Sequence, residues 1–150
     1  MLTPPVDPTL LAALVHDLAD AVVISNTEGI IVFWNGAAER TFGWTADEAV
    51  GQSLDLIIPE RQRARHWEGY GTVMATGETR YGTELLKVPS LHADGARHSI
   101  AFTVSLLKDP QGAVIGIAAV VRDETERWQM EQDLRRRLRE ASIADAPGDQ

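Results

Sequence analysis

The stretch NGAAERTFGWTADEAVG, residues 35–51, marks a change from strand to helix. Its first two residues end an apolar, β-branched run, and the AAERTFGW that follows is typical of a short helix. Thr45 and Glu48 have the spacing of a capping box, so a further helical turn is predicted through ADEAV, with Gly51 at its end. The stretch therefore predicts short helices that directly follow a strand.

The residues before this stretch predict a β-hairpin that is preceded by a helix. Two apolar runs, AVVISN and GIIVFWN, are separated by Thr-Glu-Gly, and a glycine suits the turn between them. Pro8 is well placed at a helix start, and apolar residues recur at helical spacing over about residues 9–19. This stripe consists of Leu10, Leu11, Leu14, Val15 and Leu18. The stripe either covers its own domain or packs on a second subunit, and we expect a homodimer.

The residues after the stretch predict a long helix and three further strands. Pro59 begins the helix, which runs to about Thr76 with Gly77 as its stop. GTELLKVPSL, ARHSIAFTVSLLK and AVIGIAAVV are the predicted strands, separated by the turn sequences HADG and KDPQG. This order predicts an α+β architecture, with a five-stranded antiparallel sheet and helices on one face.

The end of the chain predicts a final helix, ETERWQMEQDLRRRLRE, which Asp123 and Glu126 are spaced to cap. Apolar residues recur along it at Met130, Leu134 and Leu138. The helix is nevertheless too short to form a coiled coil by itself. We therefore expect the chain to be either a fragment of a larger receptor or a free protein that acts on partners. The expected division is a leader with an amphipathic helix (1–18), a core domain (19–122), a C-terminal signalling helix (123–141) and a disordered tail (142–150).

The composition excludes several classes of function. The chain has 150 residues, 44% hydrophobic and 24% charged, which suits one compact domain. A net charge of −8 argues against nucleic acid, because phosphate binding requires a basic face. The absence of cysteine excludes disulfides, thiolate metal sites and the cysteine adduct of light-sensing flavin domains. No apolar run is long enough to span a membrane, and we expect a cytoplasmic location.

Catalytic motifs are absent from the sequence. It contains no nucleophile elbow, phosphate-binding loop or zinc-protease motif. The histidines, His16, His66, His92 and His98, are scattered, and none are paired at the short spacings of metal ligands. The acidic residues fall mainly in turns and caps. We therefore expect a protein that is not an enzyme.

With the order of elements in place, two motifs make the sequence resemble a PAS domain of the S-box type over about residues 18–127. One motif is the stretch quoted first, and the other is the R-D-x-T-E that ends the last strand. The resemblance implies a dimeric sensor or interaction module without enzymatic activity. It also implies a signalling junction in which Asp123, Thr125 and Glu126 link the sheet to the output helix, although Glu124 stands where the family usually has an aliphatic residue.

The segment RARHWEGY, residues 63–70, lies on the predicted long helix. His66, Tyr70 and Val73 fall at i, i+4 and i+7, so they share one face that we expect to point toward the sheet. A neutral imidazole in an apolar pocket is a good iron ligand. The wider segment PERQRARHWEGY is similar to the matching helix of FixL-type haem-binding PAS sensors, and this resemblance implies haem b with His66 as the iron ligand.

The resemblance also indicates how the gas-binding face of the haem pocket would differ from that of FixL-type sensors. Leu86 occupies the position of the arginine that steadies bound oxygen in FixL-type sensors. Leu86, Val104 and Ile117 are therefore expected to form an apolar wall that favours carbon monoxide or nitric oxide over hydrogen-bonded oxygen. Thr72 replaces the arginine that pairs with a haem propionate, so Arg80 and Arg61 are the candidates for that contact.

Two alternatives to haem stay open at this level, because PAS domains bind haem, flavins, small acids or nothing. One is a ligand-free module for dimerisation or protein interaction. The other is a domain that binds an apolar small molecule in a cavity lined by its aromatic side chains.

Overall fold

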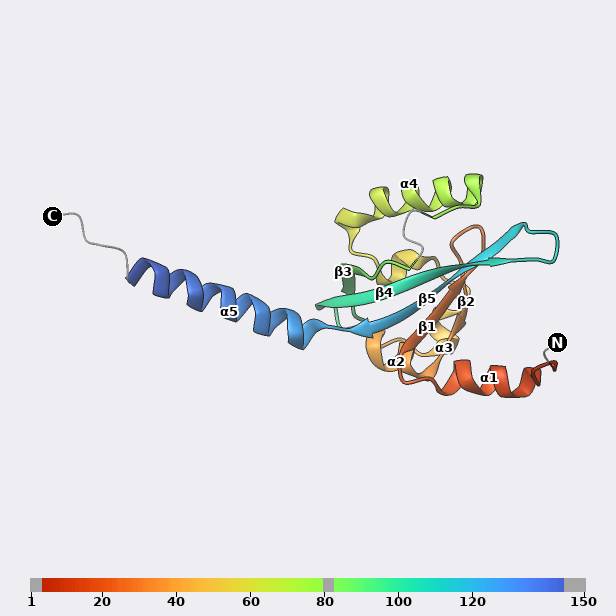
Figure 1. Cartoon of the computed structure of the whole chain (residues 1–150), viewed down its shortest axis with the longest axis horizontal. Helices are drawn as coiled ribbons and strands as arrows, with labels where there is room; N and C mark the ends of the chain where they lie inside the picture. Colours follow the sequence, from red (N-terminus) through yellow and green to blue (C-terminus); the bar gives the residue numbers. More distant parts are fainter. Residues whose placement is uncertain (1–3, 80–82, 145–150) are drawn as a thin grey trace.

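The computed structural model describes residues 4–79 and 83–144, and its strands form one antiparallel sheet (Figure 1). The strands are β1 (Ala21–Ser25), β2 (Ile31–Trp34), β3 (Leu86–Leu91), β4 (Arg97–Lys108) and β5 (Val114–Asp123). The helices are α1 (Pro8–Asp17), α2 (Gly36–Phe42), α3 (Ala46–Ala49), the 3-10 helix η1 (Leu54–Ile57), α4 (Glu60–Thr76) and α5 (Thr125–Ala144). The five strands have the order β2-β1-β5-β4-β3, and the predicted α+β architecture is confirmed.

The inner face of the sheet is built from rows of side chains on neighbouring strands. Val23 on β1 pairs with Ala119 on β5, which pairs with Val104 on β4. Two residues along, Ser25 pairs with Ile117. Side chains alternate along a strand, so these rows share one face, and this face contributes to the hydrophobic core. The face beneath α4 is therefore mainly apolar.

Asn35, the first residue of the stretch quoted first, is buried, and its side chain hydrogen-bonds to α1, β1 and α2. Its Oδ1 accepts hydrogen bonds of 2.9 Å from the backbone N–H groups of Val22 and Ala38, so that it also caps α2. Its Nδ2 donates to the carbonyl oxygens of Val15 and Asp20, at 3.0 and 3.1 Å. An amide side chain is required here because it both accepts and donates.

The short helices cover the hairpin end of the sheet. Phe42 on α2 is fully buried, and its ring lies 5.2 Å from that of Trp34. The indole N–H of Trp34 donates to the carbonyl oxygen of Trp44 at 3.0 Å. The predicted capping box between Thr45 and Glu48 is present with both of its bonds at the start of α3.

The two terminal helices leave apolar side chains exposed. α1 contacts the sheet through His16, whose ring lies 5.0 Å from that of Phe33 on β2. α5 has no buried residue and extends away from the sheet (Figure 1). The exposed large apolar side chains are Leu10, Leu11 and Leu14 on α1, and Trp128, Met130, Leu134, Leu138 and Ile143 on α5. Within residues 4–79 and 83–144, no helix combines the length and apolarity that a membrane crossing needs.

The boundaries of the last helix differ from those predicted. Asp123 is the last residue of β5, and α5 begins at Thr125. α5 continues through Ala144, so the tail predicted from residue 142 is wrong for its first three positions. Residues 141–144 contain neither glycine nor proline, and nothing in them ends a helix. The rest of the predicted tail, 145–150, lies outside the described residues.

Candidate functional site at the inner face of α4

One stripe of α4 faces the sheet, and it includes the three residues that helical phase predicted. His66 and Val73 are half-buried and Tyr70 is buried, so the prediction that His66 points inward is confirmed. Gly77 ends the helix in the left-handed conformation, with φ of 69°, as its position in the sequence predicted. The residues that face solvent include Arg61, Ala64, Arg65, Glu68 and Thr72.

The imidazole of His66 lies among aromatic rings. Its centroid is 4.7 Å from the ring of Trp67, in an edge contact, and 5.7 Å from that of Tyr70. Its Nδ1 is buried and has no hydrogen-bond partner in the described part of the chain. Burial lowers the pKa of His66 below its ordinary value of 6.5, and the carboxylate of Asp55 opposes this only in part. The ring is therefore neutral at physiological pH, with a nitrogen lone pair to offer.

Tyr70 ties α4 to the end of β1. Its hydroxyl lies 3.0 Å from Oγ of Ser25 and donates a short hydrogen bond to the carbonyl oxygen of Asn26. Burial raises the pKa of Tyr70 above its ordinary value of 10.0, and the hydrogen bond with Ser25 only partly offsets this. The phenol therefore stays protonated, and its hydroxyl is already used by the protein.

Trp67 fixes the other side of the site, and sequence reasoning missed its role. Its indole N–H donates to Oδ1 of Asp55 at 2.8 Å, and its ring lies against Gly29 in the β1–β2 turn. A Cβ atom on Gly29 would lie 2.2 Å from the Cη2 atom of Trp67, and Gly29 has φ of 78°. The glycine of the turn was visible in the sequence, but nothing nearby in the chain indicated the indole that covers it.

The predicted apolar wall comes together on the inner face of the sheet. Leu86, Val104 and Ile117 lie on β3, β4 and β5, and all three are half-buried. Val104 pairs with Ala119, and Leu86 pairs with Phe102, both of which pack against the core. Arg80, one candidate for a propionate contact, lies outside the described residues, and Arg61, the other, is exposed on α4.

The predicted signalling junction joins α5 to β4. Oδ1 of Asp123 accepts hydrogen bonds from the backbone N–H and the hydroxyl of Thr125, at 2.8 and 2.5 Å. The same hydroxyl accepts from the backbone N–H of Ser99 at 2.9 Å, and the N–H of Glu124 donates to the Ser99 carbonyl at 2.7 Å. Glu126 is exposed in the first turn of α5.

Two of the histidines that were described as scattered in sequence lie together in space. His92 follows β3 and His98 lies on β4, and their rings stack with centroids 4.7 Å apart. A ligand atom from each of His92, Asp94 and His98 lies within 4.8 Å of the others. Helical spacings could not indicate this pair, because a hairpin brings together two histidines that are six residues apart.

Comparison with known proteins gives the same architecture. A family model described as PAS fold matches residues 15–129. The PAS domain of a protein from Colwellia psychrerythraea superimposes with a TM-score of 0.70 and 19% identity, covering 79% of this chain and 98% of that one. At this identity, the likeness concerns the fold alone.

Two curated relatives are similar in sequence. Sensor protein FixL from Bradyrhizobium diazoefficiens is 30% identical over 120 residues, which cover 69% of this chain and 24% of that protein. Oxygen sensor protein DosP from Escherichia coli (strain K12) is 27% identical over 126 residues, which cover 84% of this chain and 16% of that protein. The chain therefore spans about a quarter or less of the length of these relatives.

Proposed function

This chain belongs to the PAS family, and we propose that it is a sensor domain that holds haem b through His66 and responds to a gas or to the redox state of the iron. The buried Nδ1 of His66, which lacks a partner among the described residues, carries the haem assignment. A buried polar atom without a partner costs about 1–3 kcal/mol. Iron would use the lone pair of the neutral ring and fix which ring nitrogen keeps the proton.

The side chains on the inner face of the sheet suit a flat apolar ligand. Leu86, Val104 and Ile117 face inward and yet are only half-buried, so the protein itself does not fully cover this part of the inner face. Val73 is half-buried on the same stripe of α4 as His66. An apolar surface of this kind excludes water from a porphyrin. Burial of that surface by a ligand would be favourable by about 25 cal/mol per Å².

Within this stripe, His66 offers iron a neutral nitrogen without a hydrogen-bond partner among the described residues. Tyr70 offers an oxygen, but that hydroxyl bonds Ser25 and Asn26, and the raised pKa keeps it protonated. Haem, when bound, supplies the iron that takes up a diatomic gas or an electron. Leu86, Val104 and Ile117 carry no side-chain hydrogen-bond donor, so beside a haem they would give bound oxygen no hydrogen bond and would thereby favour carbon monoxide or nitric oxide.

The output of the proposed sensor runs through the junction at the start of α5. Asp123, Thr125 and Ser99 form one hydrogen-bonded unit between β4 and the helix. A shift of β4, which also carries Val104, would move Ser99 relative to α5. The unit therefore supports a transfer of strain from the inner face of the sheet to the helix.

Titration with haemin tests the ligand role. We expect the parent protein to bind one haem per chain with a sharp Soret band, and the variant His66→Ala to lose that band. His16→Ala is the matched control, because His16 is an exposed histidine on the far element α1. A parent protein without a Soret band, or a His66→Ala variant with the parent's spectrum, would remove haem from the proposal.

A second candidate function is a homodimerisation module that needs no ligand. The exposed stripe of α1, formed by Leu10, Leu11 and Leu14, supports it, because burying such a stripe against a second copy is favourable. Leu11→Glu combined with Leu14→Glu should convert a dimer to a monomer in light scattering. Met130→Glu on α5 is the matched control and should remain a dimer. If the α1 variant stays dimeric while Met130→Glu becomes monomeric, the interface lies on α5 instead.

A further inference from the structure

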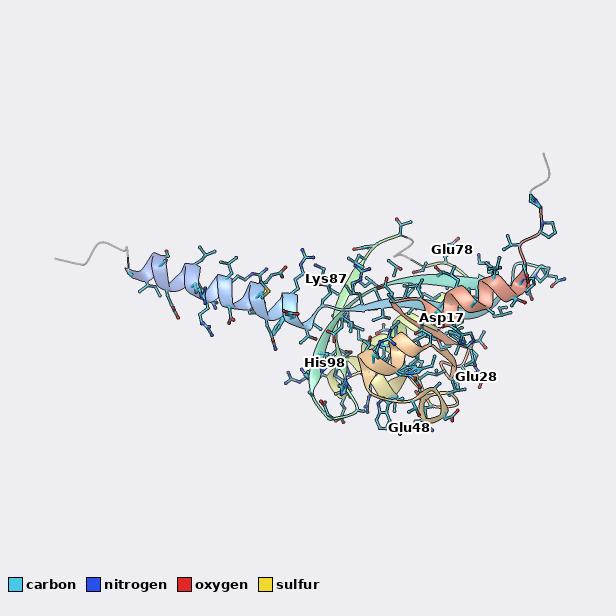
Figure 2. All side chains as sticks on the ribbon, turned by 90° about the horizontal axis from the view of Figure 1, so that it is seen from below. Asp17, Glu28, Glu48, Glu78, Lys87 and His98 are labelled. Carbon is cyan, nitrogen blue, oxygen red and sulfur yellow. The ribbon has the colours of Figure 1, made fainter. Side chains whose placement is uncertain are left out.

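A pair of stacked histidines lies at the end of the sheet from which α5 leaves, where Figure 2 labels His98. Three side chains of the β3–β4 hairpin, His92, Asp94 and His98, each place a possible ligand atom within 4.8 Å of the others. We propose that these three side chains form a binding site for a divalent first-row transition-metal ion such as Zn²⁺. This site is separate from His66 and does not depend on haem.

The arrangement of donor atoms favours a cation between them. Nδ1 of His92 lies 3.1 Å from Oδ1 of Asp94, and it accepts a hydrogen bond of 3.2 Å from the backbone N–H of Asp94. Nδ1 of His92 and the carboxylate of Asp94 are thus already adjacent, and a metal ion can bridge these two atoms when Nδ1 carries no proton.

The third donor, His98, keeps one ring nitrogen available to an ion. Nδ1 of His98 lies 3.3 Å from Oδ2 of Asp123, and because a carboxylate only accepts, Nδ1 is the donor and Nε2 keeps its lone pair. Histidine ligands of metals are commonly held in this way by a carboxylate on the other nitrogen. Asp123 is thus a positioning residue for His98.

The hairpin that carries the donors is well anchored. A Cβ atom on Gly43, which ends α2, would lie 2.5 Å from Cε1 of His92 and 2.8 Å from its Nε2, so this edge of the ring packs against the helix end. The backbone N–H of Ala93 donates to the carbonyl oxygen of Phe42 at 2.9 Å. The packing encloses Nε2 of His92 and leaves Nδ1, beside Asp94, as the nitrogen that an ion reaches when it replaces the bond from the Asp94 N–H.

The donor types select the class of ion. Two imidazoles and a carboxylate suit Zn²⁺, Ni²⁺ or Co²⁺, whereas Mg²⁺ and Ca²⁺ prefer sites made of oxygen alone. With bonds of about 2.0–2.2 Å at tetrahedral angles, Zn²⁺ holds its donors about 3.3–3.6 Å apart. The donor atoms, which lie up to 4.8 Å apart, must therefore draw together, and the stacked rings must turn, when the ion binds. The histidine side chains are 21% and 23% exposed, and that of Asp94 is 61% exposed, which lets an ion enter from solvent.

Occupation of this site would be transmitted to the output helix. The carboxylate of Asp123 bonds both His98 and Thr125, so it joins the metal site to the first turn of α5. A metal on Nε2 makes the Nδ1–H of His98 a stronger donor and strengthens its bond to Asp123. We therefore expect zinc to increase the protection of the start of α5.

Calorimetric titration of haem-free protein without an affinity tag tests the site, with ZnCl2 as the probe and MgCl2 as the control salt. We expect the parent to bind one Zn²⁺ per chain and no Mg²⁺. His98→Gln and Asp94→Asn should each weaken zinc binding at least about tenfold. His16→Gln and His66→Ala should bind zinc as the parent does, so failure of the haem proposal leaves this result unaffected.

Far-UV circular dichroism without metal establishes whether each variant is folded. If a histidine variant does not fold, Asp94→Asn still tests the site, because Asp94 is exposed. Hydrogen exchange at residues 124–128 should slow on zinc addition in the parent but not in Asp123→Asn. A parent that binds no zinc, or zinc binding that His98→Gln and Asp94→Asn leave unchanged, would overturn the site. Zinc binding without a change at residues 124–128 would overturn its link to α5.

Discussion

The hydroxyl of Tyr70 lies 3.0 Å from Oγ of Ser25, and this contact joins α4 to the inner face of β1. The same hydroxyl donates to the carbonyl oxygen of Asn26. Tyr70→Phe removes both bonds and leaves buried acceptors, so we expect a loss of about 1–3 kcal/mol in the free energy of unfolding. Urea denaturation measures it. Ser25→Ala, which removes only one of the bonds, should cost less, and equal losses would contradict this assignment.

The packing of Trp67 on Gly29 makes that glycine irreplaceable. Gly29→Ala should lower the free energy of unfolding by more than about 2 kcal/mol, because it combines a left-handed φ with a clash against the indole. Gly95→Ala is the matched control, since Gly95 has φ of 87° but nothing within 4 Å of an added Cβ. Comparable losses in the two variants would mean that Trp67 can move aside.

The bonds of Asp123 to Thr125 predict a local effect at the start of α5. Asp123→Ala should weaken the attachment of the helix by about 1 kcal/mol, as for a lost cap. Hydrogen exchange should rise over residues 124–138 while the sheet stays protected. Glu126→Ala is the control, because Glu126 is exposed in the same turn and should leave exchange nearly unchanged. Equal protection in Asp123→Ala and the parent would show that this junction is not a hinge.

The lowered pKa of His66 gives stability a defined pH dependence in the haem-free protein. Burial favours the neutral ring, so below its ordinary value of 6.5 the unfolded chain binds more protons than the folded one. The free energy of unfolding should therefore fall as pH drops from about 7.5 to 5.5. In His66→Gln this decrease should be smaller than in the parent. A difference between the two proteins that does not vary with pH would contradict the buried, neutral ring.

Much of this architecture could be predicted because its signals are local. The spacing of Thr45 and Glu48 is that of a capping box, and the phase of α4 placed His66 toward the sheet. The contacts that could not be predicted join distant segments. Trp67 covers a turn formed by residue 29, and His92 meets His98 only after a hairpin forms. The end of α5 differs from the prediction because residues 142–144 contain neither glycine nor proline to end the helix.

Rescue by free imidazole tests the central claim, that His66 holds haem iron, most directly. His66→Gly leaves space where the side chain stood, and haemin is added to this variant with and without imidazole, beside the parent and His16→Gly. We predict that the parent and His16→Gly give the same Soret spectrum, that His66→Gly loses it, and that imidazole restores it. A parent spectrum that survives in His66→Gly without imidazole, or haemin that binds none of the three proteins, would contradict the claim.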